Sequence, residues 1–167
     1  PLADERMKIY RAWTASSNPL LVLSALVDAY DLVTEAMPRE IGQSARVVPP
    51  ALLKEIGELA TPRLTHHNPW VQSVALAIVE CTGLEQAATD ALRTMCRNEK
   101  QRTLPVVRKE AFRYLGQAPA IDATDVKILL DGLREPELAD EMYDYPAEGL
   151  KAAAKSSPAL GGLILAQ

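Results

Sequence analysis

One helical spacing recurs along this chain, and it constrains the fold more than any other feature. In its clearest copy, Val107, Ala111 and Leu115 stand four residues apart and a glycine follows. A β-branched, a small and a large apolar residue at this spacing form one apolar stripe of an α-helix, and the glycine ends that helix. Weaker copies begin about 36 residues earlier, at Trp70, and roughly 38 to 39 residues later, at Pro146. The chain is therefore expected to consist of similar helical units.

The composition favours helices over strands. Apolar residues make up 48% of the 167 residues, but aromatic residues make up only 5%. Alanine and leucine dominate, and both stabilise helices, whereas strands are typically rich in β-branched and aromatic side chains. We expect an all-α chain that is long enough to bury its own core.

Apolar periodicity and capping residues place the individual helices. In chain order, they are expected at about residues 3–15, 19–37, 51–60, 69–82, 85–97, 104–116, 124–134 and 146–156. In the first two, the inward-facing residues are expected to include Met7, Ile9, Tyr10, Trp13, Leu20 and Val27. Asn18-Pro19 and Asn68-Pro69 are predicted helix starts, since asparagine caps a helix and proline suits its first position.

The string V-R-x-x-A-x-x-x-L-G, from Val107 to Gly116, resembles the second helix of a HEAT repeat. The helices after residue 50 form three pairs, whose spacing is close to the roughly 40 residues of such repeats. The resemblance covers about residues 50–157 and implies a short right-handed α-α superhelix, a HEAT-like solenoid of about three helical pairs plus an N-terminal helical pair. The third pair departs from the pattern, because Pro146 and Gly149 replace its β-branched and charged positions.

We divide the sequence into an N-terminal helical pair with its connector, residues 1–48, and HEAT-like helical repeats, residues 49–167. Whether the N-terminal pair is a degenerate repeat stays open, since it matches the later pairs only loosely. The tail from Ala159 to Gln167 is apolar to its end, whereas solenoid ends normally carry a polar capping unit. We therefore expect the chain to be a fragment of a longer protein.

Charge and motifs exclude several classes of function. The net charge of −4 argues against general affinity for nucleic-acid backbones, although residues 61–120 are locally basic. Nucleotide-binding and hydrolase signatures are absent from the sequence. His66-His67 lies in a loop and lacks further ligands at metal-binding spacing, and the acidic segment from Glu135 to Asp144 lacks the glycine turn of a calcium loop. We expect no catalytic residue, no metal and no cofactor.

The candidate site is a surface that contacts a partner. Lys109 and Arg113 are four residues apart, opposite the apolar stripe, so they should project together. The HEAT resemblance implies that second helices line a concave face. Together with two tyrosines of the acidic loop, the predicted partner-binding residues are Lys109, Arg113, Gln72, Ser73, Glu80, Tyr143 and Tyr145. For Arg108 the same resemblance implies a structural role, in which it pairs with an acidic residue of a neighbouring turn.

We therefore expect a protein–protein interaction module or scaffold whose partner is a protein, with nucleic acid not favoured and no membrane span. The alternative is a HEAT-like enzyme or enzyme subunit, of the bilin-lyase or alkylpurine DNA glycosylase type. Cys81 and Cys96 are expected to be buried free thiols, and the expected location is cytoplasmic. The identity of the partner and the oligomeric state are left open.

Overall fold

A computed structural model describes residues 2–35, 48–83, 86–97, 103–119, 121–138 and 144–166. Within these ranges the regular elements are all helices, as the composition predicts. The chain divides into two compact units, Pro1–Gly83 and Leu84–Gln167. The boundary predicted between residues 48 and 49 lies inside the first unit.

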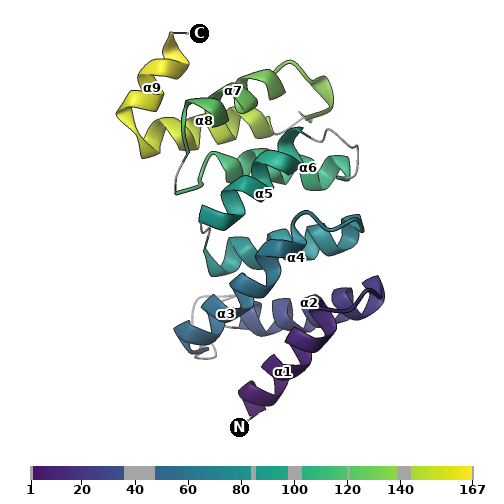
Figure 1. Cartoon of the computed structure of the whole chain (residues 1–167). Helices are drawn as coiled ribbons and strands as arrows, with labels where there is room; N and C mark the ends of the chain where they lie inside the picture. Colours follow the sequence, from purple (N-terminus) through teal and green to yellow (C-terminus); the bar gives the residue numbers. More distant parts are fainter. Residues whose placement is uncertain are drawn as a thin grey trace. The chain divides into compact units, whose positions relative to one another are not determined.

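The first unit consists of two helix pairs (Figure 1). Its elements are α1 (Leu2–Thr14), α2 (Pro19–Glu35), α3 (Pro50–Ala60), the 3-10 helix η1 (Thr61–Arg63) and α4 (Pro69–Thr82). The helix α1 pairs with α2, and α3 pairs with α4. In addition, α2 packs extensively against α4, while α1 contacts α3. The first helices of the two pairs therefore form one layer and the second helices form another.

The two predicted Asn-Pro helix starts are confirmed. The side chain of Asn68 accepts hydrogen bonds from the backbone N–H groups of Trp70, at 2.9 Å, and Val71, at 3.4 Å. Asn18 accepts one from the N–H of Leu20 at 3.0 Å. Each asparagine thus satisfies donors that a helix N-terminus leaves unpaired, and the following proline has no N–H to satisfy.

Several residues predicted to face the core of the first unit are exposed instead. Met7 and Tyr10 are buried as predicted, but Ile9 and Trp13 flank that stripe and are 46% and 40% exposed. Leu20, in the first turn of α2, is 69% exposed, and Val27 is also exposed. The helical period was correct, but the apolar residues spread over a wider arc than the neighbouring helices cover. Those at the edge of the arc remain in solvent.

The second unit also has two layers. Its elements are α5 (Gln86–Arg97), α6 (Pro105–Leu115), α7 (Ala123–Gly132), the 3-10 helix η2 (Pro136–Leu138), α8 (Tyr145–Ser156) and α9 (Pro158–Leu165). The first helices α5 and α7 contact each other, and the second helices α6 and α8 pack extensively together. The pairs α5 with α6 and α7 with α8 connect the two layers. The last helix, α9, packs on α7 and α8.

A close backbone approach joins α6 and α8. A Cβ atom on Gly149 would lie 2.5 Å from the carbonyl oxygen of Phe112 and 2.7 Å from Cδ2 of Leu129. The end of α6 takes part as well, because a Cβ atom on Gly116 would overlap the backbone of Gly149. On α6, Ala111 is fully buried. The glycine that departs from the repeat pattern therefore has a steric reason: it lets the two helices touch along their main chains.

Two arginines of the second unit have structural ion pairs. Arg108 is 8% exposed and donates to both carboxylate oxygens of Glu135, at 2.6 and 2.8 Å, and its Nε donates to the carbonyl oxygen of Cys96 at 2.8 Å. The prediction that Arg108 pairs with an acidic residue of a neighbouring turn is confirmed. Arg93 on α5 binds the buried Asp125 of α7 at 2.6 and 2.8 Å. These pairs tie α5, α6 and the α7 region together.

The helix α9 was not predicted from the sequence. Two adjacent glycines, Gly161 and Gly162, lower the helical propensity of this segment. The helix nevertheless begins with a cap, in which the Ser157 side chain accepts from the N–H of Leu160 at 3.5 Å, and with Pro158 at its first position. Packing against α7 and α8 outweighs the propensity of the two glycines.

Candidate functional site

Three of the predicted contact residues lie on α4 in the first unit, and one of them is buried. Gln72 is only 3% exposed, and its side-chain amide donates to the carbonyl oxygen of His66 at 2.8 Å. It therefore holds the loop before α4 in place and is not available to a partner. Ser73 is half-buried and Glu80 is exposed, so these two positions remain accessible.

In the second unit the structure brings together two predicted residues that are 36 positions apart in the sequence. The ammonium group of Lys109 on α6 lies 5.6 Å from the centre of the Tyr145 ring at the start of α8. A cation over an aromatic face is attracted by the ring quadrupole, by roughly 0.5–1 kcal/mol at an exposed site. Tyr143, the other predicted tyrosine, lies outside the described residues.

Arg113 lies one turn further along α6 and is held by its neighbours. Its Nε donates to Glu110 at 2.8 Å, its guanidinium carbon lies 4.3 Å from the centre of the Tyr114 ring, and it also bonds the Tyr114 hydroxyl. Its side chain is 27% exposed. Arg113 is therefore a fixed cation at the surface rather than the freely projecting one that the sequence predicted.

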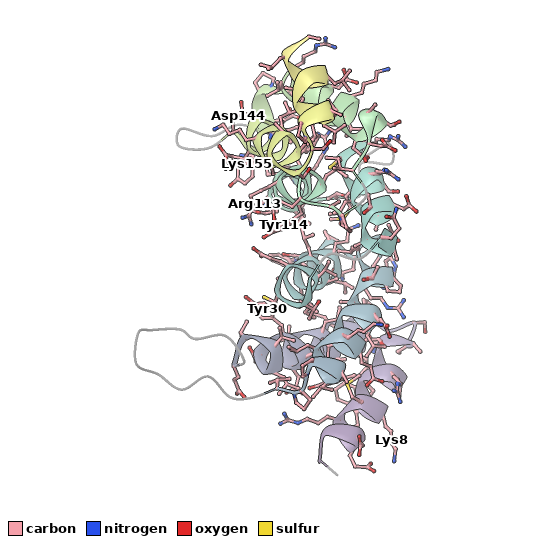
Figure 2. All side chains as sticks on the ribbon, turned by 90° about the vertical axis from the view of Figure 1, so that its left-hand side faces the viewer. Lys8, Tyr30, Arg113, Tyr114, Asp144 and Lys155 are labelled. Atoms are coloured by element: carbon pink, nitrogen blue, oxygen red, sulfur yellow. The ribbon has the colours of Figure 1, made fainter. Side chains whose placement is uncertain are left out.

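An open groove lies between α6 and α8 beside Arg113. Its volume is about 450 Å³, and its lining residues are Arg113, Gln117, Glu148, Lys151, Ala152, Lys155 and Ser156. Figure 2 shows Arg113, Tyr114, Asp144 and Lys155 along the same side of the second unit. We call the surface formed by Lys109, Arg113, Tyr145 and this groove the α6/α8 face.

Apart from Tyr145, sequence reasoning missed the residues that α8 contributes to this face. Glu148, Lys151 and Lys155 follow one another at spacings of three and four residues, which places them on one side of a helix. That signal was present in the sequence. It became informative only when packing placed α8 next to α6, because the spacing alone describes any solvated helix face. Lys151 forms an ion pair with Glu148 at 2.5 Å, and Lys155 is exposed.

A second cavity, of about 620 Å³, lies between α7 and α9. Its walls are mainly the apolar side chains of Val126, Leu130, Leu133, Leu163 and Ile164, and Lys127, Asp131 and Arg134 stand at its edge. Lys127 is exposed, while Asp131 and Arg134 form an ion pair with each other at 3.1 Å. This cavity belongs to the first-helix side of the unit and is separate from the α6/α8 face.

The histidine pair lies in the loop before α4, as the sequence predicts. The two rings are 4.2 Å apart, and Nδ1 of His66 accepts a hydrogen bond from the backbone N–H of Asn68 at 3.1 Å. Burial, helped by the neighbouring His67 and Arg63, lowers the pKa of His66. The pair is therefore part of the loop that caps α4. Among the described residues, no group of three or more potential ligands could hold a metal ion.

Both cysteines are free, but they differ in burial. Cys96 is buried, as predicted, whereas Cys81 is half-exposed. Burial raises the pKa of both thiols, and the nearby Glu80 also raises that of Cys81. Within the part of the chain that the structure describes, no helix is long and apolar enough to cross a membrane.

Comparison of the chain with protein-family models, with curated proteins and with solved structures gives no match. The resemblance to HEAT repeats therefore depends on the residues of this chain alone.

Proposed function

We propose that this chain is a short HEAT-like α-solenoid that serves as a protein–protein interaction module, with the α6/α8 face as its binding surface. The observation that carries the proposal is the meeting of Lys109 and Tyr145 across two helices, next to an open groove lined by Arg113. Tyrosine and arginine are enriched where proteins bind one another, because each combines a large contact area with hydrogen-bonding groups.

The packing inside each unit supports the solenoid. First helices contact first helices and second helices contact second helices, which is the arrangement of stacked helix pairs in a repeat protein. Such stacking leaves the outward side of the second helices in solvent, where neighbouring repeats do not cover it. A binding surface of this kind needs no reactive group. The free thiols of Cys81 and Cys96 fit the cytoplasmic location that we also propose.

The test is capture of a partner by the tagged chain, compared between two matched variants. Lys109→Gln with Arg113→Gln removes two cations from the α6/α8 face. Arg97→Gln with Lys127→Gln removes two exposed cations from α5 and α7, so the change in net charge is the same. We expect the first variant to bind a stoichiometric protein partner at least tenfold more weakly, which is about 1.4 kcal/mol, and the second to bind it normally.

The substitution at position 113 is to glutamine and not to glutamate, because a glutamate there would face Glu110 and add repulsion within α6. A thermal melt of each variant shows whether the fold is preserved. If the Arg97/Lys127 variant loses the partner while the Lys109/Arg113 variant keeps it, the binding surface lies on the first-helix side and the proposal is wrong. Co-purification of a pigment or nucleic acid, detected by absorbance, would favour the alternative of an enzyme or enzyme subunit.

A further inference from the structure

We propose that the groove between α6 and α8 binds an acidic segment of the partner protein, and that Arg113, Lys151 and Lys155 hold its carboxylates. This inference rests on the proposed function and names the chemistry of the partner. The groove lining contains three cations and one carboxylate, Glu148, although the chain as a whole is acidic. The residues that line the groove therefore carry a net positive charge, whereas the whole chain carries a net charge of −4.

The three cations have different tasks in this geometry. Arg113 is held in position by Glu110 and Tyr114, so it offers a charge whose place is fixed before binding. Lys155 is exposed on a flexible stem, so it can turn toward an incoming carboxylate. Lys151 bonds Glu148, but this ion pair is exposed and contributes at most a small stabilisation. A carboxylate of the partner can therefore replace Glu148 without a large loss.

The spacing of the lysines indicates how the carboxylates are arranged. Lys151 and Lys155 are one helical turn apart, which places their Cβ atoms about 5–6 Å from each other. Alternate residues of an extended peptide are about 7 Å apart and point to the same side. An extended segment with acidic residues at every second position therefore matches the two lysines.

The same face argues against a nucleic acid as the occupant. A phosphate backbone binds through several successive cations and is repelled by interspersed carboxylates. Here Glu110, Asp144 and Glu148 lie on the helix surfaces that carry the cations. A peptide with an acidic side chain at every second position can place its neutral residues beside these carboxylates, but a strand with a phosphate at every residue cannot.

The probe is a fluorescein-labelled peptide with the sequence Glu-Ser repeated four times, and its control is the same peptide with Gln for Glu. Anisotropy titrations with the complete chain are expected to show binding of the Glu-Ser peptide and at least tenfold weaker binding of the Gln-Ser peptide. Lys151→Gln with Lys155→Gln is expected to weaken the Glu-Ser complex at least tenfold. The matched variant Arg97→Gln with Lys127→Gln is expected to change it less than twofold. A labelled single-stranded oligonucleotide of eight nucleotides tests the nucleic-acid alternative and is expected to bind more weakly than the Glu-Ser peptide.

The location of the bound peptide is checked independently of charge. In a ¹⁵N-labelled sample, the backbone amide signals of Gln117, Ala152 and Ser156, which line the groove without carrying charge, are expected to shift with the Glu-Ser peptide. Three results would each overturn the proposal. The Lys151/Lys155 variant could bind the Glu-Ser peptide as tightly as the Arg97/Lys127 variant does. The parent chain could bind the Gln-Ser peptide as tightly as the Glu-Ser peptide, or bind the oligonucleotide more tightly than the Glu-Ser peptide.

The two proposals can fail separately. If the Glu-Ser peptide does not bind, but the Lys109/Arg113 variant loses the captured partner, the α6/α8 face binds protein and the acidic-segment inference is wrong. If the peptide binds in the groove, but partner capture is unaffected by the Lys109/Arg113 change, the groove does bind acidic peptides, but the captured partner binds elsewhere and the proposed function is wrong for that partner.

Discussion

The contact between α6 and α8 can be tested by adding one methyl group. Gly149→Ala places a Cβ atom where the carbonyl oxygen of Phe112 would be 2.5 Å away and Cδ2 of Leu129 would be 2.7 Å away. Both separations are well below van der Waals contact. The Leu129 side chain can rotate, but the Phe112 oxygen belongs to the main chain of α6. The variant therefore folds only if the two helices move apart by several tenths of an ångström.

The expected free-energy change follows from two opposing effects. Alanine favours a helix interior over glycine by roughly 0.5–1 kcal/mol. Overpacking a well-packed core costs typically about 1–3 kcal/mol, and here the obstacle is backbone. We therefore expect Gly149→Ala to lower the free energy of unfolding by about 1–2 kcal/mol. The measurement is urea-induced unfolding, followed by circular dichroism at the helical wavelength.

Gly162→Ala provides a matched control, because Gly162 lies inside α9 and a Cβ atom there would meet nothing within 4 Å. The same substitution should then show only the propensity gain and stabilise the chain by up to about 1 kcal/mol. The two variants are expected to change stability in opposite directions. If Gly149→Ala is as stable as Gly162→Ala, the close approach of α6 and α8 is wrong.

Two further predictions concern the ion pair of Arg108 and the cysteines. Hydrogen bonds from Arg108 lower the pKa of Glu135, so the pair stabilises the fold above the unfolded pKa of glutamate, near 4.3, and this contribution is lost as the pH falls through the folded pKa. Glu135→Gln is thus expected to cost about 1–2 kcal/mol in urea unfolding at pH 7. The difference from the parent should shrink mainly below about pH 4, as the pH falls through the lowered pKa of Glu135, and an equal difference at pH 7 and at about pH 3 would contradict the charge-based reasoning. Native Cys81 should react with a thiol reagent faster than the buried Cys96, and both should react fully after denaturation, so mass analysis that finds Cys96 labelled first would show that its helix is not packed as described.

Local signals in the sequence located most of the helices, because helix starts and stops depend on neighbouring residues. Asn68 with Pro69 began α4 as predicted, and Asp122 capped α7 by accepting from the N–H groups of Thr124 and Asp125. The residue type of Gln72 predicted a surface position, although its spacing places it on the same side of α4 as the buried Ala75, Leu76 and Val79. Its side-chain amide donates to the carbonyl oxygen of His66, six residues earlier, and this hydrogen bond allows the polar side chain to be buried. The sequence alone does not show that such an acceptor lies nearby.

The candidate site shows the same division between local and long-range information. The spacing of Lys109 and Arg113 correctly placed both on one side of α6. The contact of Lys109 with Tyr145 depends on how α8 packs, and packing is decided by Gly149, which the repeat pattern marked only as an exception. A departure from a repeat is thus informative about where two elements meet, since it marks a position at which tertiary structure overrides the local preference.

The main-chain contact at Gly149 also determines which residues of the groove can be substituted. At Gly149 the main chains of α6 and α8 touch directly, and no side chain lies between them. The distance between the outer faces of the two helices therefore does not depend on which residues occupy positions 151 and 155. Residues 151 and 155 can therefore be substituted without a change in the spacing between α6 and α8. Acidic or aromatic residues introduced there would give a family of grooves that differ in ligand preference and share one scaffold.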